Sequence, residues 1–257
     1  MKRMMDRWVM ALGCVVALFS SPILSADWSR TEIQIQDGTY DQIYGGDSYD
    51  AVIITLQHLS GWKYGSNFFF VDQTFSDSGN DSYAELYSTL NASKIFDAEM
   101  NWLGIKDVGL VMGFNVAADS NVVKYLPGVN IEWRVPGFQY FGTMATAYFD
   151  DSDGTPVPRE DDSWMLDLAW DSFFELWGQK FLFTGHVEYI AERDNEFGKE
   201  VSDWVLAQPQ IRYDLGYLMY GQDDQLYVGI EYQYWNNKLG DKDTDERVTQ
   251  LLVIWHL

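Results

Sequence analysis

Few residues in this chain could perform catalysis. The chain has three histidines, at positions 58, 186 and 256. Only His186 has suitable neighbours, because Thr184 and Glu188 share its face if the segment is a strand. A base and a hydroxyl on one strand do not make a charge-relay arrangement, and the chain has no His-x-x-Ser or nucleophile-elbow motif. The sequence therefore predicts no catalytic residues and disfavours an enzyme.

Polar side chains that alternate with apolar ones offer binding chemistry instead. Carboxylates, amides and arginines can hydrogen-bond sugar hydroxyls and base edges, and rings such as Phe68, Phe70, Tyr87 and Tyr227 offer faces for stacking. The alternative is a plug in which opposite charges on neighbouring strands neutralise each other. The polar positions assigned to one interior face are Asp72, Glu85, Asn130, Glu132, Arg134, Asp167, Glu188, Gln208, Gln210, Arg212, Glu231 and Gln233.

Composition narrows the class of protein. The chain has 257 residues, 17 Lys and Arg against 39 Asp and Glu, 16% aromatic residues and one cysteine. So many aromatic residues argue against disorder. A net charge of -22 disfavours nucleic acid as a partner, because it repels phosphate. A single cysteine excludes disulfide bonds within the chain and metal clusters held by several cysteines.

The first 26 residues have the pattern of a secretory signal peptide. Lys2, Arg3 and Arg7 precede an apolar stretch, and Ala26 ends a plausible cleavage site. The apolar stretch is too short for a membrane-spanning helix, which needs roughly 20 residues. Cys14 follows a loose lipoprotein-like sequence but lies in the middle of the stretch. We therefore expect a signal peptide over 1–26 and a single domain over 27–257.

Alternation of apolar and polar residues recurs throughout the rest of the chain and predicts strands. In residues 129–135 the odd positions are apolar and the even positions are polar or charged. Twelve segments of about the length of a tilted membrane strand follow from such patterns and turn residues. They are 29–36, 50–59, 66–76, 84–92, 107–117, 126–135, 138–149, 163–172, 180–191, 204–214, 225–236 and 247–257. We expect an all-β, antiparallel transmembrane β-barrel of about twelve strands, with a soluble β-sandwich as the alternative.

The connections between these segments alternate in character, as they do in outer membrane barrels. The longer set, expected outside, is rich in Asp, Gly and Ser and comprises residues 37–49, 77–83, 118–123, 150–162, 193–203 and 237–246. The shorter set includes 60–65, 136–137 and 173–179, although 93–106 and 215–224 are longer. The acidic runs could be solvated loops, or they could hold divalent cations that bridge to lipopolysaccharide phosphates. No complete EF-hand loop is present, so no metal ligands are named.

Aromatic residues fall near many of the predicted strand ends, where amphipathic rings favour the boundary between membrane and water. The final strand also runs to the last residue with alternation, as is common in outer membrane barrels, but it ends on Leu257 rather than an aromatic residue. The aromatic residues assigned to two membrane girdles are Trp28, Tyr49, Trp62, Tyr64, Phe75, Tyr83, Phe138, Phe149, Trp164, Trp204 and Trp235.

The segment 55–95 resembles the nucleoside-specific channel-forming (Tsx-like) family of outer membrane proteins, including its OmpK-type branch. The shared pieces are His58 after a strand, a Gly-Trp-Lys-Tyr-Gly turn, an aromatic strand that reaches Asp72, and Glu85 in the next strand. Residues 209–214 also look like a later strand of the family. The resemblance implies a twelve-stranded barrel, passive uptake of nucleosides or related solutes, and loops that phages use in some members. OmpK-type members need not share the nucleoside preference.

We therefore expect an outer membrane channel for passive diffusion of small solutes such as nucleosides, without a cofactor. Phe70 would stack on the solute, Asp72 and Glu85 would hydrogen-bond it, and Arg134 and Arg212 would supply opposing positive charge. Outer membrane lipid and lipopolysaccharide, a small solute and phage are the expected partners, and the barrel is expected to be a monomer. The alternative is a closed barrel with a structural or surface-recognition role.

Overall fold

The structure is a computed structural model that describes residues 26–77 and 79–257. The predicted signal peptide, including Cys14, lies outside the described residues except for Ala26. Among the described residues, no helix is long and apolar enough to cross a membrane.

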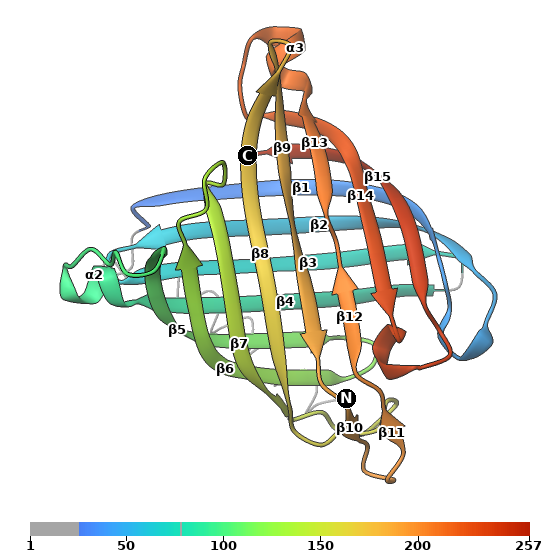
Figure 1. The fold of residues 1–257 in the computed structure, drawn as a ribbon. Helices are drawn as coiled ribbons and strands as arrows, with labels where there is room; N and C mark the ends of the chain where they lie inside the picture. Colours follow the sequence, from blue (N-terminus) through green and yellow to red (C-terminus); the bar gives the residue numbers. More distant parts are fainter. Residues whose placement is uncertain (1–25, 78) are drawn as a thin grey trace.

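The described chain forms one closed antiparallel β-barrel (Figure 1). Each spanning strand pairs with its neighbour in sequence, and the first strand pairs with the last through Glu32 opposite His256 and Asp37 opposite Leu251. The spanning strands are β1 (Trp28–Tyr40), β2 (Tyr49–Trp62), β3 (Gly65–Ser76), β4 (Gly79–Asn91), β5 (Ile105–Ala117), β6 (Val122–Trp133), β7 (Tyr140–Asp150), β8 (Ser163–Leu176), β9 (Gln179–Ile190), β12 (Trp204–Ala207) with β13 (Gln210–Asp214), β14 (Leu226–Asn236) and β15 (Glu246–His256). All twelve predicted strands are confirmed, with shifts of a few residues at their ends.

The tenth crossing is divided into β12 and β13 by Pro209. Both halves keep one register against β9, with Ala207 opposite Val187 and Gln210 opposite Thr184. Proline has no backbone N–H to donate, so the ladder is interrupted there while the strand continues. The predicted segment 204–214 is therefore one crossing of the membrane.

Short elements lie in the connections at the two ends of the barrel. The connections 41–48, the β3–β4 turn, 118–121, 151–162, 191–203 and 237–245 form what we call the outer end. The connections 63–64, 92–104, 134–139, 177–178 and 215–225 form the inner end. The outer end contains η2 (Ile43–Gly45), β10 (Arg193–Asp194), β11 (Glu200–Val201) and η3 (Lys238–Gly240), and the inner end contains α2 (Ala92–Phe96) and α3 (Leu215–Tyr220).

Side chains alternate between the two faces of the wall, and the interior is the polar face. In β15 burial alternates at every residue, so that Glu246 and Gln250 are inside while Leu251 and Val253 are exposed outside. β1 likewise buries Glu32 and Gln34 and exposes Ile35. A water-soluble barrel would have the opposite polarity. A closed antiparallel barrel with an apolar exterior suits a bilayer, and the protein is a multi-pass β-barrel of the outer membrane.

Two details of the predicted ends are wrong. The outer connection expected over 77–83 is a tight turn, because β4 already begins at Gly79 and pairs with Ser76. Four of the predicted girdle residues instead face the lumen, because an aromatic side chain at a strand end follows the parity of its strand. Those four are Tyr49, Tyr83, Trp204 and Trp235.

The apolar exterior leads to a prediction about Leu251, which lies midway along β15 and is 63% exposed. Arginine at this height of the lipid-facing surface should lower the free energy of unfolding by about 2–4 kcal/mol. Urea titration of the Leu251→Arg barrel in phospholipid vesicles measures the change. Leu239→Arg, on an exposed outer connection, is the matched control and should have little effect.

Candidate solute path through the lumen

The interior of the barrel is acidic and densely hydrogen-bonded. Buried carboxylates outnumber buried lysines and arginines among the described residues. The carboxylates are Glu32, Asp107, Asp150, Glu188, Asp214, Glu231, Asp241 and Glu246, and the cations are Lys124, Arg193, Arg212 and Lys238. This excess of negative charge makes the interior favourable for cations and unfavourable for anions.

A bidentate ion pair across the interior joins Glu32 on β1 to Arg212 on β13. Two parallel bonds form, from Arg212 Nη1 to Glu32 Oε2 at 3.1 Å and from Nη2 to Oε1 at 3.0 Å. Gln34 and Gln57 donate to the same carboxylate, at 2.7 and 3.2 Å. Bidentate pairing fixes both side chains in one geometry. The pair spans the strands β14 and β15, which lie between β13 and β1.

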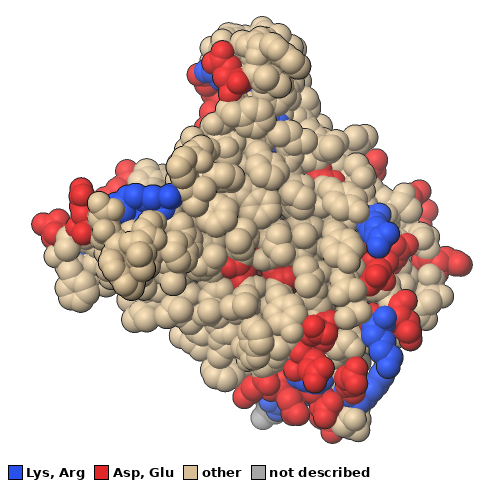
Figure 2. All heavy atoms as spheres, viewed as in Figure 1, with Lys and Arg blue, Asp and Glu red and all other residues tan. Residues whose placement is uncertain are grey.

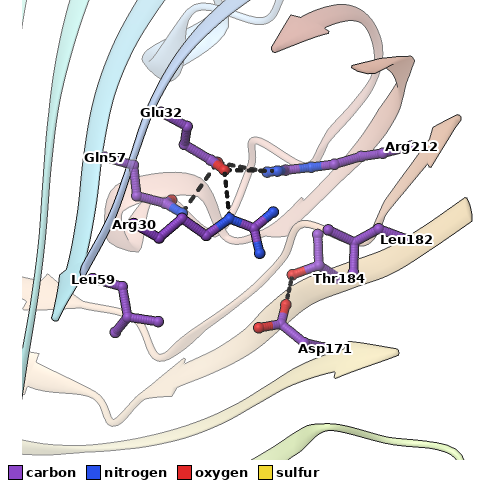
Figure 3. A pocket seen from close by; sticks show the side chains of 8 residues that line it. All are labelled: Arg30, Glu32, Gln57, Leu59, Asp171, Leu182, Thr184 and Arg212. Atoms are coloured by element: carbon purple, nitrogen blue, oxygen red, sulfur yellow. Dashed lines mark hydrogen bonds and ion pairs between the residues drawn. The ribbon is translucent and has the colours of Figure 1, made fainter. Parts of the chain in front are cut away.

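A small cavity lies beside this ion pair (Figure 3). Its volume is about 40 Å³, and Glu32, Arg30 and Gln57 point into it from one side while Arg212, Thr184 and Asp171 face it from the other. A polar space of this size is large enough for water. It is too small for a sugar or a nucleobase, so the lumen is constricted here.

A cluster of glutamines continues the constriction toward the outer end. Glu231 accepts hydrogen bonds from Gln36 at 3.2 Å, Gln208 at 3.2 Å and Gln250 at 2.8 Å. Gln250 in turn accepts from the hydroxyl of Tyr40 at 2.8 Å. Each amide has both a donor and an acceptor, so one carboxylate can organise side chains from several strands.

Three of the predicted site residues meet on β3 and β4. Phe70 lies opposite Glu85 in the ladder, and Asp72 lies opposite Tyr83. The rings of Phe70 and Tyr83 are 6.0 Å apart, and the hydroxyl of Tyr83 donates to Glu85. Asp72 accepts a hydrogen bond from Thr55 at 2.5 Å. This arrangement places aromatic faces and carboxylates side by side on the lumen wall.

The two predicted arginines lie far apart in the structure. Arg212 faces the lumen as expected and holds Glu32. Arg134 is exposed beyond the end of β6, and its Nη1 donates to the carbonyls of Met100 at 2.6 Å and Ile105 at 2.9 Å. The expectation that Arg134 lines the lumen is wrong, because the strand ends at Trp133 and the side chain turns to the inner-end connection.

His186 has a carboxylate partner but no nucleophile. Its Nδ1 lies 2.9 Å from Asp167, and its Nε2 lies 2.9 Å from the amide oxygen of Gln208. A histidine that activates a nucleophile needs a hydroxyl or thiol at the second nitrogen. The amide oxygen of Gln208 accepts a hydrogen bond there, so the geometry suits a hydrogen-bonding residue of the wall.

Basic side chains that the sequence analysis did not single out close the outer end. Lys124 contacts Asp150 at 3.1 Å and Glu160 at 2.6 Å, and Arg193 contacts the same Glu160 at 2.7 Å. Arg193 also lies 4.4 Å from the ring of Trp204 inside the barrel. These contacts fold the connections 151–162 and 191–203 inward. Alternation places Lys124 on the interior face, but no sequence signal brings Arg193 from its connection into the lumen.

A second contact joins the connections 41–48 and 237–245. Lys238 contacts Glu246 and donates to the carbonyl of Asp41 at 2.7 Å. The hydrogen bond from Thr244 lowers the pKa of Asp241, which also accepts from the backbone of Tyr44. No group of three or more His, Cys, Asp or Glu side chains suited to a metal ion occurs within residues 26–77 and 79–257.

The Glu32–Arg212 pair can be tested by removing one partner. Glu32→Met leaves both Nη atoms of a buried arginine without that acceptor and should cost about 3–5 kcal/mol of stability. The double variant Glu32→Met with Arg212→Met should recover part of the loss, because the buried guanidinium of Arg212 is then absent, while Arg30 and His256, which also contact Glu32, keep Asp224 as a partner. Urea unfolding in vesicles compares the three barrels. A double variant less stable than Glu32→Met would contradict this assignment.

Comparison with known proteins supports the fold of the chain but does not identify its function. No family model and no curated protein sequence matches the chain. Among solved structures, the NanC porin matches with a TM-score of 0.54 and 13% identity over 88% of this chain and 100% of that one. An outer membrane channel from Pseudomonas putida F1 matches with a TM-score of 0.49 and 10% identity over 89% and 95%. The outer membrane phospholipase of Salmonella typhi matches with a TM-score of 0.49 and 8% identity over 88% and 90%.

Sequence identities of 8–13% show only that the chains share a fold. The match to NanC covers the whole length of that porin, so the two chains share a barrel of the same kind. The chain is a twelve-stranded barrel of the outer membrane type.

Proposed function

We propose that the protein is a passive diffusion channel for small polar solutes across the outer membrane. The observation that carries the proposal is the polar interior, in which carboxylates, amides and aromatic rings line a lumen with excess negative charge. Such groups hydrogen-bond hydroxyl-rich or amide-like solutes and disfavour anions. The constriction at Glu32 and Arg212 then sets the size of solute that passes.

Side chains rather than backbone close the constriction. Arg212 reaches from β13 to Glu32 on β1, and the unbranched side chains of Gln210 and Gln250 hydrogen-bond Glu231 on the strand beside them. Rotation of such side chains is fast compared with motions of the backbone. For a solute to pass, the amides and the guanidinium must break their hydrogen bonds to one another and form hydrogen bonds to the solute. The strands can stay in place while this happens.

We further propose nucleosides or similar solutes as the permeant class. Phe70 and Tyr83 present adjacent rings, and Asp72 and Glu85 lie on the same two strands as acceptors for hydroxyl and base N–H groups. A flat base with a hydroxyl-bearing sugar matches this combination. The resemblance of segment 55–95 to the nucleoside-specific channel family supports the same class.

Single-channel recording in planar bilayers tests the channel. The purified barrel should give discrete conductance, and a salt gradient should yield a reversal potential of the sign expected for cation preference, because buried carboxylates exceed buried cations. Added nucleoside should reduce the current. A channel that prefers anions would contradict the charge argument, and conductance indifferent to nucleosides would leave a channel for other solutes.

Substitutions on β3 separate stacking from charge. Phe70→Leu should raise the nucleoside concentration for half-block by roughly fivefold or more, because stacking of a base on an aromatic side chain contributes about 1–3 kcal/mol. Asp72→Asn should reduce cation preference. Arg134→Gln is the control and should leave both quantities unchanged, because Arg134 lies outside the lumen. Equal effects from all three would show that the block does not occur at β3.

A closed barrel with a surface-recognition role is the second candidate. Leu126, Glu246 and Ile254 are fully buried inside the barrel, and the ion pairs at Glu160 draw the outer connections inward. In this case the acidic outer connections would form the binding surface, and the partners of the monomeric barrel would be phage or lipopolysaccharide bridged by cations. A folded barrel that shows no conductance in the bilayer recordings would favour the surface-recognition role. Activity assays would then be needed to test whether the barrel is an enzyme.

A further inference from the structure

The connections at the inner end expose large apolar side chains. Eight of them are 45–90% exposed and form what we call the inner-end apolar surface: Ile95, Phe96, Trp102, Leu103, Trp177, Leu218, Met219 and Tyr220. They belong to two projections, one containing α2 and the other containing α3 with the tip of the β8–β9 hairpin. The two projections stand away from the barrel on different sides (Figure 1). Exposed apolar patches of this kind mark contact with a partner or a membrane.

The α2 projection is held rigidly against the barrel. The side chain of Arg134 donates to the carbonyl of Met100 in this projection and to that of Ile105 at the start of β5, and the backbone N–H of Arg134 donates to the carbonyl of Gly104 at 2.7 Å. Lys94 donates to the carbonyls of Trp62 at 3.1 Å and Gly65 at 2.7 Å. These hydrogen bonds hold the apolar residues of the α2 projection away from the barrel.

The α3 projection is fixed in a similar way. Asp214 ends β13 and accepts hydrogen bonds from the backbone of Tyr217 at 2.8 Å and of Asp224 at 2.9 Å. Lys180 of β9 lies 4.3 Å from the ring of Tyr217 and pairs with Asp223. Figure 2 shows this projection at the top of the view, with few charged side chains, whereas charged side chains gather at the opposite end.

The backbone at two tips of this surface is strained. Leu103 has φ of 50° and Trp177 has φ of 53°, and each is followed by a glycine. Bulky residues rarely occupy this left-handed region, and they do so at a cost in free energy. Both side chains are among the most exposed in the described chain, at 76% and 90%. Both residues lie in two-residue turns that are closed within the chain, with Leu176 opposite Gln179 and Trp102 opposite Ile105. Such turns require positive φ at both central residues, and they hold these two side chains out from the barrel.

We propose that the inner-end apolar surface inserts into the phospholipid leaflet on the inner side of the outer membrane. The surface continues the apolar exterior of the barrel through Tyr64 and Phe174, which are also exposed. Tryptophan and tyrosine favour the interface between headgroups and acyl chains. Two projections on different sides suit a lipid leaflet that surrounds the barrel. A symmetric dimer would cover one self-complementary patch and leave the other in water.

One basic residue near the surface fits the same partner. Lys63 lies in the neighbouring turn, with its ammonium 4.9 Å from the ring of Tyr64. A lysine beside an interfacial ring can reach the lipid phosphates while its stem follows the apolar surface. The outer end differs, because its connections are dominated by Asp and Glu.

Single spin labels test the proposal without reference to conductance. Residues 27–257 contain no cysteine, so Leu103→Cys, Trp177→Cys and Leu218→Cys can each be labelled in a Cys14→Ser background. The barrels are reconstituted in phosphatidylethanolamine and phosphatidylglycerol vesicles, and accessibility to oxygen is compared with accessibility to a water-soluble nickel complex. Leu251→Cys provides the lipid-exposed reference, and Phe197→Cys on an exposed outer connection provides the aqueous reference.

The three inner-end labels should be several-fold less accessible to nickel than the label at position 197 and should approach the reference at position 251. Nickel accessibility equal to that at position 197 would overturn the proposal. Spin–spin broadening that grows with the ratio of protein to lipid would assign the surface to a second copy and would overturn it as well. Migration in gels before and after heating verifies that each variant is folded, and the exposed positions tolerate labels.

Discussion

Backbone hydrogen bonding in lipid is the constraint on which this structure depends. No water in the bilayer core can satisfy an N–H or C=O group, so a sheet can cross only if it has no free edge. The pairing of β1 with β15 removes that edge. Closure also divides every strand into one face toward lipid and one toward the lumen. The inverted polarity of the wall, with Leu251 outside and Gln250 inside, follows directly.

The lumen must then satisfy its own polar groups or hold solvent. Glu32 is surrounded by donors from Arg212, Gln34 and Gln57, and Glu231 by several glutamines. Buried charges of this kind are tolerated only when they are paired and hydrogen-bonded. The same groups are well suited to exchanging partners with a polar solute. A stable constriction and a permeable one can therefore share the same side chains.

The two ends of the barrel solve different problems. At the outer end, Lys124, Arg193 and Lys238 neutralise carboxylates and draw connections toward the lumen. At the inner end, Arg134 and Lys94 bind backbone carbonyls and hold apolar residues away from the barrel. Long basic side chains thus hold the connections in place at both ends of the barrel. Their partners decide whether a connection turns inward or outward.

Alternation by itself determined the twelve strands and the facing of Phe70, Asp72, Glu85 and Arg212, because the side-chain period of a strand is two and one face must be apolar. This period does not determine the residue at which the pairing between two strands ends. Arg134 has the parity of a lumen residue but lies past the last paired residue of β6. Only the closed, staggered barrel decided that Arg212 reaches Glu32 across two intervening strands. Contacts between distant strands depend on stagger and closure, which a local pattern does not contain.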